Sequence, residues 1–485
     1  MCQKESPIQK DQNELVRQRL ENLKALKETG IYPYGGRYDT SVRIKDLVDD
    51  FKEGIDTKVA GRIMAMRSHG KSAFCDLRDS EGKIQIYLKA DKLPEGQFAA
   101  FKSIDIGDII GAEGKTFKTR TGEPTIEAAS FTFLSKGLRP LPEKWHGLKD
   151  VETRYRQRYV DLIVNEPARR IFRMRSQLTK NIRDFLDSRG YLEVETPMMH
   201  PIPGGAAGKP FRTHHETLDM DLYLRIAPEL YLKKLLVGGL ERVYEINRSF
   251  RNEGISTRHN PEFTMLEVYT AYGDCATTME LTQELITQAA KEVLGKTQFE
   301  YQGKGIDLDH WDKISFAGLM EKEYGILPDD DEKVWVKKLK KKGLEIEGKT
   351  LSRTQLINII GDLVTPESKG HPVFVVDLFS ELCPLAKKKR DNPLLADRFE
   401  LYIGGMEIAN AYSELNDPIE QRLRFEAQAK DTKEDIDEDF IRALEYGMPP
   451  AGGLGIGIDR LTMILTDSAS IRDVILFPQM RPEKG

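Results

Sequence analysis

The run FRNEGISTRHNPEF, from Phe250 to Phe263, decides the fold class, because it predicts two strands joined by a loop, with an arginine where the first strand ends. A second arginine ends the run GLGIGIDR, from Gly453 to Arg460. A guanidinium held in this way binds phosphate oxygens through two parallel donors, which a lysine ammonium cannot do. Arg251 and Glu253 alone also suit an ordinary hairpin with surface ion pairs. The two runs together predict a nucleotide site.

Strand alternation assigns the side chains around this loop to faces, because residues two apart on a strand point the same way. Arg251 is expected to bind the α-phosphate of ATP, and Phe263 to stack beneath the adenine. Glu253 shares a face with Arg251 and is placed to accept from the adenine amino group. The loop brings Arg258 and His259 toward the outer phosphates. The hairpin is therefore predicted to form the floor of the nucleotide site.

The glycines of the second run allow another part of the backbone to approach closely. Asp459 is expected to cap a helix that begins at Arg460, so that Arg460 lies over the base and reaches the γ-phosphate. The run is neither a Walker A sequence nor a Rossmann fingerprint, because it lacks the G-K-[ST] ending and the third glycine. It indicates a nucleotide site only in combination with the run from Phe250 to Phe263.

A third run, FELYIGGMEIANAYSELND, spaces Glu400, Glu407 and Glu414 seven residues apart. Mg²⁺ bound to ATP is held by one or two carboxylates and keeps several waters, which makes Glu400 and Glu407 the expected ligands. Seven is odd, so simple alternation cannot place all three acids on one face. A bulge or turn is needed, either at Gly404–Gly405 or within Ala409–Ala411.

Length and composition set wider bounds. The chain has 485 residues, enough for two or three domains, and 73 basic against 78 acidic residues give a net charge of −5. This charge argues against a polybasic mode of nucleic-acid binding but leaves room for a local basic face.

The four cysteines show no C-x-x-C pair, so reduced structural thiols are expected. We find neither a signal-peptide core nor an apolar run near the roughly 20 residues of a membrane span, and expect a cytoplasmic protein.

The hydrophobic pattern and the turn residues of the sequence predict three structural parts. Residues 1–54 are expected to form a helical extension, and 55–148 an all-β barrel of five short strands. Residues 149–485 predict an α+β domain, with an antiparallel sheet flanked by helices and a helical insertion at about 311–370. One of these helices is expected from Pro167 to Arg189, with proline near its start and glycine just past its end.

With these runs in hand, the chain resembles the class II lysyl-tRNA synthetases of the bacterial type over nearly its full length. Arg251 with Phe263 matches the second signature motif of that family, and Arg460 ends the third. The helix that starts near Pro167 and leads to Pro197 matches the first, which forms the dimer interface in this class. The resemblance implies an OB-fold anticodon-binding barrel, a homodimer, and the substrates L-lysine, ATP and tRNA(Lys).

The resemblance also implies site residues. The lysine side chain and α-amino group are two ammonium groups that need compensating carboxylates, and the family's lysine pocket matches Gly205, Glu229, Glu267, Tyr269, Asn410, Tyr412 and Glu414. The ATP site gains Asn260. Phe74 and Gln85 match the anticodon readers. Two positions depart from the family pattern: Tyr412 replaces a phenylalanine, and Ser130 stands where an acid is expected, which leaves the reader of the third anticodon base open.

Three alternatives remain. An aspartyl or asparaginyl synthetase shares the nucleotide motifs and the barrel, but relatives for aspartate place a positive residue where Glu414 stands. A lysyl ligase that modifies proteins would lack the barrel. A non-catalytic tRNA-binding derivative should have lost one of the residues Arg251, Phe263, Glu407 or Arg460, and all four are present.

Overall fold

The computed structural model describes residues 7–142, 148–206, 208–344, 370–432 and 436–483, together with 356, 359–361 and 363. The chain forms two compact units, Met1–Lys149 and Asp150–Gly485. Among the described residues, no helix has both the length and the apolar character needed to cross a bilayer.

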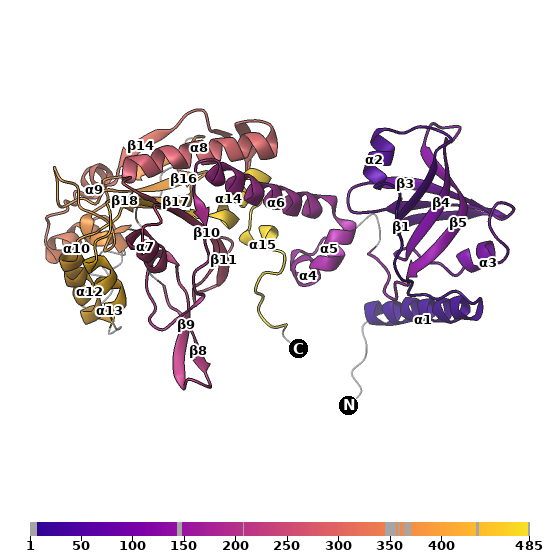
Figure 1. The fold of residues 1–485 in the computed structure, drawn as a ribbon, viewed down its shortest axis with the longest axis horizontal. Coiled ribbons are helices and arrows are strands. Elements are labelled where there is room, and N and C mark those ends of the chain that lie inside the picture. Colours follow the sequence, from indigo (N-terminus) through magenta and orange to yellow (C-terminus); the bar gives the residue numbers. More distant parts are fainter. Residues whose placement is uncertain are drawn as a thin grey trace. The chain divides into compact units, whose positions relative to one another are not determined.

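The first unit is built around a closed barrel with the strand order β1-β2-β3-β5-β4, which confirms the predicted all-β fold of this region (Figure 1). Leu26, Ile44 and Leu47, which precede the barrel, belong to the same apolar core as the barrel strands. The helices before the barrel therefore pack on it. The elements are α1 (Pro7–Glu28), α2 (Ile44–Asp49), β1 (Asp56–His69), β2 (Ser72–Arg78), β3 (Lys83–Lys89), α3 (Gln97–Phe101), β4 (Ile109–Lys118) and β5 (Pro124–Ser135).

The second unit contains an eight-stranded sheet with the order β14-β15-β16-β17-β18-β11-β10-β6. Its six inner strands are antiparallel, as predicted, whereas the two outermost, β14 and β6, pair in parallel with their neighbours. The strands are β6 (Leu192–Glu193), β10 (Arg242–Phe250), β11 (Glu262–Ala271), β14 (Asp312–Ser315), β15 (Val373–Val376), β16 (Arg398–Ile403), β17 (Met406–Ser413) and β18 (Ala451–Gly457).

Smaller elements surround this sheet. The strands β7 (Met199–His200), β8 (Phe211–His215) and β9 (Met220–Leu224) form one small sheet, and β12 (Gln298–Tyr301) with β13 (Lys304–Asp307) forms a hairpin. The helices are α4 (Val151–Arg156), α5 (Arg158–Val164), α6 (Glu166–Asp187), α7 (Glu229–Val237), α8 (Cys275–Leu294), α9 (Phe316–Tyr324), α10 (Glu332–Lys341), the 3-10 turn η1 (Ser380–Leu382), α12 (Pro418–Thr432), α13 (Glu438–Glu445), α14 (Ile458–Thr466) and α15 (Ile471–Val474).

Helices α6, α8 and α14 cover one face of the large sheet (Figure 1). Their apolar side chains share a core with alternate strand residues such as Leu266, Leu454 and Ala411. The residues between those, among them Glu267 and Asn410, therefore point to the other face. This second face carries the candidate site.

The predicted insertion at 311–370 is wrong at its start. Asp312–Ser315 forms β14 and pairs in parallel with β15, so the chain enters the insertion through an edge strand of the sheet. Helices α9 and α10 follow as predicted, and Phe316, Trp335 and Leu339 are buried in a separate apolar cluster. Most of the remaining stretch up to 369 lies outside the described residues.

Asp459 does not cap a helix, which corrects the sequence prediction. Helix α14 begins at Ile458, two residues earlier than expected, and its N-cap Gly457 makes no side-chain cap. The carboxylate of Asp459 is 2.5 Å from Nη1 of Arg175 in α6 and accepts from the backbone N–H of Thr264 in β11 at 2.7 Å. A carboxylate that is 2% exposed needs such partners, and these outcompete a capping role.

We expect Arg175→Met to lower the free energy of unfolding by about 3 kcal/mol, because it leaves the buried Asp459 carboxylate without its cation. The matched control is Arg173→Met, since Arg173 lies on the same helix and is exposed. Thermal unfolding followed by circular dichroism measures both. Equal unfolding midpoints for the two variants would show that the ion pair does not stabilise the fold.

Candidate active site

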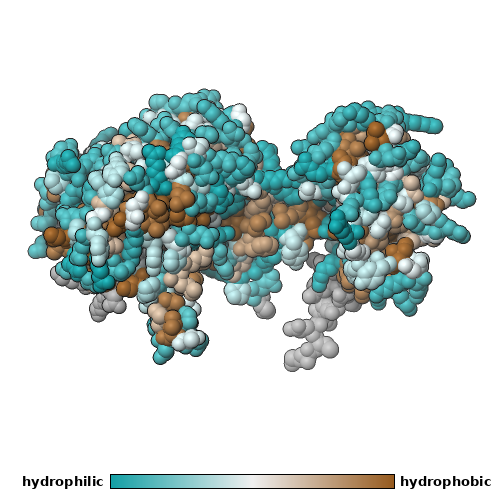
Figure 2. Space-filling view, in the orientation of Figure 1, coloured by the Kyte–Doolittle hydropathy of each residue, from teal (hydrophilic) through white to brown (hydrophobic). Residues whose placement is uncertain are grey.

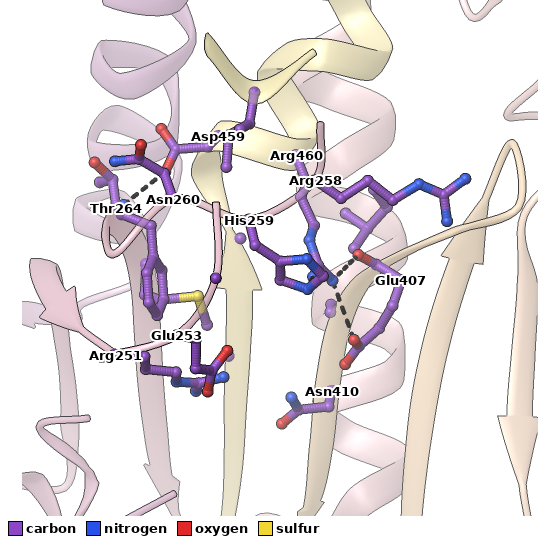
Figure 3. Close-up of a pocket in the computed structure, with 18 residues that line it drawn as sticks. Arg251, Glu253, Arg258, His259, Asn260, Thr264, Glu407, Asn410, Asp459 and Arg460 are labelled. Atoms are coloured by element: carbon purple, nitrogen blue, oxygen red, sulfur yellow. Dashed lines mark hydrogen bonds and ion pairs between the residues drawn. The ribbon is translucent and has the colours of Figure 1, made fainter. Parts of the chain in front are cut away.

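A pocket lies on the face of the large sheet opposite α6, α8 and α14, where the β10–β11 loop meets β17, β18 and the start of α14 (Figure 3). The structure brings the seven predicted ATP residues together here, with Glu407, a predicted Mg²⁺ ligand, and Asn410, a predicted lysine-binding residue. They are Arg251, Glu253, Arg258, His259, Asn260, Phe263, Glu407, Asn410 and Arg460. Glu400 is not part of the lining.

Arg251 follows directly after β10. Its backbone N–H donates to the carbonyl of Pro261 at 2.9 Å, so the hairpin ladder continues one residue beyond the strand. Its guanidinium lies 5.1 Å from the centroid of the Phe263 ring. Burial lowers the pKa of Arg251, and its Nε is buried without a hydrogen-bond partner in the described part of the chain. A buried, unsatisfied guanidinium donor suits an anionic ligand.

Arg460 lies in the first turn of α14, and its guanidinium lies beside Glu407 of β17. Its Nη1 donates to the backbone carbonyl of Glu407 at 2.8 Å and to the Glu407 carboxylate at 3.1 Å, as the dashed lines of Figure 3 show. Its Nη2 lies 3.3 Å from Nε2 of His259. Burial and the charge of Arg460 lower the pKa of His259, so the ring is neutral at neutral pH and can accept from the guanidinium.

A bulge places Glu400 and Glu407 on one face, but it lies at Ile408, outside both stretches where the sequence predicted it. Leu401 pairs with Ala409 and Tyr402 pairs with Glu407, so Ile408 is the extra residue of β17. The Glu400 carboxylate accepts from Nη2 of Arg398 at 2.7 Å and from the Tyr402 hydroxyl at 3.0 Å. Carboxylate oxygens are the ligand type that a hard cation such as Mg²⁺ prefers.

A cluster of three buried acids continues from this pocket along the same strands. Glu229, Glu267 and Glu414 are 6%, 6% and 1% exposed. The hydroxyl of Tyr412 donates to Glu229 at 2.6 Å, and the hydroxyl of Tyr269 donates to Glu267 at 3.2 Å. These two contacts involve four of the residues predicted to bind lysine.

Burial disfavours the charged forms of two of these acids. It raises the pKa of Glu267 to about 8, and the nearby Glu229 carboxylate adds to the rise. Burial also raises the pKa of Glu414 to about 8, although the ammonium of Lys233 opposes this. The cluster therefore holds more negative charge than its surroundings compensate.

Lys233 was missed by the sequence analysis. Its Nζ lies 2.7 Å from Glu229 and 2.5 Å from Glu414, and the side chain is completely buried. Two of the acids predicted to be open to a ligand are thus already bridged by a cation of the chain. The four-residue spacing of Glu229 and Lys233 on one helix was the available signal, because such residues share a helix face.

Two glycines shape this cluster. A Cβ on Gly453 would lie 1.7 Å from Oε1 of Glu414, so only glycine permits that carboxylate to lie across β18. Gly205 has a φ of +88°, and a Cβ there would lie 3.3 Å from Cβ of Glu229. The predicted Gly204–Gly205 loop therefore lies against the first acid of α7.

The barrel carries a separate candidate site. Phe74 on β2 stacks on Tyr87 of β3 with ring centroids 4.6 Å apart, and Phe117 of β4 meets Tyr87 edge-on at 6.2 Å. Gln85, on the same strand face as Tyr87, accepts from the Thr125 hydroxyl at 3.1 Å. Sequence reasoning found Phe74 and Gln85 but not the two further aromatic rings. Stacked, partly exposed rings are the usual platform for unpaired bases.

One group of metal-ligand side chains gathers outside these sites within the described ranges. His310 and His371 each place Nε2 near the carboxylate of Asp312, at 3.3 and 2.9 Å. The group lies where the chain enters β14 and returns to β15, at the edge of the sheet away from the pocket.

Comparisons with known proteins agree with this geometry. A family model described as tRNA synthetases class II (D, K and N) matches residues 150–481, and one described as an OB-fold nucleic acid binding domain matches 57–134. The lysine–tRNA ligase of Carboxydothermus hydrogenoformans is 55% identical over 97% of this chain and 98% of its own. Those of Moorella thermoacetica and Bacillus subtilis are 52% and 49% identical, over 98% and 97% of this chain and 99% and 97% of theirs.

We expect Gly453→Ala to destabilise the second unit by about 2 to 3 kcal/mol, because the new methyl group overlaps the Glu414 carboxylate and forces it or the strand to move. Gly457→Ala is the matched control, since a Cβ at this end of the same strand meets no atom nearer than 3.7 Å. Thermal unfolding compares the two. A Gly453→Ala protein as stable as the control would contradict the close approach seen here.

Proposed function

The chain belongs to the class II lysine–tRNA ligases, and we propose that the pocket and the acidic cluster described above are its ATP site and its lysine site. Enzymes of this family join lysine to tRNA at the expense of ATP. One observation carries the assignment of the two sites. Asn410 pairs with Gly455 in the pocket, and Tyr412 pairs with Gly453 in the acidic cluster, two residues further along both strands. The two sites are therefore about 7 Å apart on one sheet face.

The first step needs no protein nucleophile, because the carboxylate of lysine attacks the α-phosphate of ATP and pyrophosphate leaves. Catalysis then consists of positioning and of stabilising the charge that develops. Arg251, at the junction of the two sites, is placed to hold the lysine carboxylate and the α-phosphate together. Arg258, His259 and Arg460 line the part of the pocket that suits the outer phosphates. Phe263 offers its ring to the adenine.

In the second step a terminal hydroxyl of tRNA attacks the carbonyl carbon of the lysyl-adenylate, and AMP leaves. By family analogy this is the 3′ hydroxyl of tRNA(Lys). Glu253 and Asn260 complete the nucleotide site, with Glu253 facing the base. We propose that the protein acts in the cytoplasm, together with its tRNA.

We assign Glu400 and Glu407 as the residues that hold Mg²⁺. The bulge at Ile408 supports this, because it turns both carboxylates to the ATP face, and neither is fully buried. A bound Mg²⁺ would neutralise charge on the triphosphate. Within the chain itself, Arg460 orients the Glu407 carboxylate through the contact at 3.1 Å.

For the anticodon we assign the aromatic platform of the barrel. Phe74 is placed to stack on one base, and Tyr87 extends the stacking surface beside it. Gln85 can read a base edge with its amide N–H₂, because its oxygen is engaged by Thr125. Ser130 lies on β5 opposite Glu113, so a carboxylate is present on the neighbouring strand.

We further propose a homodimer formed through α6 and the segment that follows it. Leu192, Met198 and Met199 in that segment are 52%, 49% and 52% exposed, which is unusual for clustered large apolar side chains. Figure 2 also shows apolar surface on the β8–β9 hairpin, whose Leu218 is 63% exposed. A second copy would cover such surface.

The test is amino-acid-dependent exchange of pyrophosphate into ATP, run with each of the twenty amino acids. We expect exchange with lysine alone, because only lysine supplies two ammonium groups at the right separation. Arg251→Ala serves as the inactive control, and should lose exchange while keeping its oligomeric state. Exchange driven by aspartate or asparagine, or by no amino acid, would overturn the assignment.

Lysine binding should be linked to proton release. Glu267 and Glu414, each with a pKa of about 8, are largely protonated at pH 7 in the free enzyme and must ionise beside the ammonium groups. Lysine affinity should therefore rise from pH 6 to pH 8, by at most about tenfold per pH unit for each proton released, and level off above. Calorimetric titration across this range measures it.

Glu267→Gln should reduce that slope, because one of the two ionising groups is gone. ATP affinity, measured on the same samples, is the control and should not follow the same curve. A lysine affinity that stays constant from pH 6 to pH 8 would contradict the raised pKa values.

A further inference from the structure

We propose that Lys233 is a resident cation of the lysine pocket: when all three carboxylates are ionised beside the bound substrate, it leaves the pocket a net two negative charges and so tunes it to an amino acid with two ammonium groups. The proposal rests on the function assigned above and concerns how that site selects its substrate. Lys233 is a positioning residue here, because it acts through Glu229 and Glu414.

The charge count is the first argument. Glu229, Glu267 and Glu414 contribute three negative charges when ionised, and Lys233 contributes one positive charge. Burial lowers the pKa of Lys233, but the Glu229 and Glu414 carboxylates outweigh this and raise it, so the ammonium stays charged. The two negative charges that remain match the ε-ammonium and α-ammonium groups of one lysine. Arg251 compensates the substrate carboxylate from the neighbouring pocket.

The fixed position of Lys233 is the second argument. The side chain has no exposed surface, and its Nζ lies 5.6 Å from the centroid of the Tyr412 ring. Helix α7 carries Lys233 and Glu229 on the same face, and both belong to the wall that packs against β11. An ammonium expelled from this place would have to be buried elsewhere without partners, at a high cost. Lys233 therefore stays when the substrate binds.

The remaining acceptor capacity is the third argument. Oε2 of Glu414 lies 2.5 Å from Nζ of Lys233, and no second donor serves this buried oxygen among the described residues. Within the part of the chain that the structure describes, Glu267 is hydrogen-bonded only to Tyr269 and forms no ion pair. The cluster thus holds its acids in place while leaving oxygens free for a ligand.

The position of Lys233 has a consequence for specificity. An uncharged side chain of similar length, as in norleucine, supplies one ammonium group and leaves one buried negative charge without compensation. Without Lys233, even lysine would leave one such charge. A residue that does not touch the substrate's carbon chain therefore helps to decide which amino acid is accepted.

The experiment measures pyrophosphate exchange kinetics of the full chain and of the variants Lys233→Met, Glu229→Gln and their combination. Lys233→Met should raise the KM for lysine about tenfold or more, as expected when one partner of a buried charge pair is removed, and change the KM for ATP less than about twofold. The matched control is Lys234→Met. Lys234 is the next residue on α7 but pairs with Asp439 at 2.8 Å, away from the cluster.

The combined variant tests whether the net charge of the cluster or the shape of its side chains determines the KM for lysine. Lys233→Met leaves three negative charges and Glu229→Gln leaves one, whereas the two together restore two. We therefore expect the combined variant to have a lower KM for lysine than either single variant. If Lys233→Met does not fold, as judged by thermal unfolding, the comparison of the combined variant with Glu229→Gln still tests the proposal.

Other outcomes overturn it. A lower KM for lysine in Lys233→Met would show that Lys233 competes with the substrate for the acids. An unchanged KM would show that it only supports the fold, and additive losses in the combined variant would show that charge is not what matters. If the wild-type protein shows no exchange with lysine, the proposed function itself fails, which is a different result.

Discussion

The catalytic unit depends on the buried carboxylate of Asp459. Through Arg175 it is joined to α6, and through the Thr264 N–H it is joined to β11. Arg175 also donates to the Thr264 hydroxyl at 3.0 Å. Three segments that lie far apart in the sequence are thus fixed by one ion pair and two hydrogen bonds. Arg460 follows Asp459 directly, so the same contacts determine where its guanidinium enters the pocket.

A second constraint is electrostatic and acts on the other half of the site. The acidic cluster is a region of low dielectric in which uncompensated charge is costly, and its carboxylates are held by hydroxyl donors and by one ammonium. In such a site a cationic ligand favours the ionised forms of the acids, whereas burial favours their protonated forms when no ligand is bound. The same buried carboxylates therefore determine both the affinity for a cationic ligand and the free-energy cost of the empty cluster.

Much of this architecture could be predicted from the sequence, because it depends on local patterns. Alternation gave the hairpin that carries Arg251 and Phe263, and the odd spacing of Glu400 and Glu407 required a bulge, which is found at Ile408. What could not be predicted depends on contacts between distant segments. The partner of Asp459 is 284 residues away, and Lys233 meets Glu414 only because α7 packs beside the sheet. The edge strand β14 is too short for a clear pattern.

That edge strand has an evolutionary consequence. The chain departs from the sheet after Ser315 and rejoins it at Val373, so the two ends of the intervening segment are held on adjacent strands, at opposite ends of the short parallel β14–β15 ladder. Loop closure has then already been achieved by the sheet, and lengthening or shortening the segment adds little entropy cost. The position is a natural place for lineages to gain or lose whole modules, and for a reporter domain to be grafted, without moving a single catalytic atom.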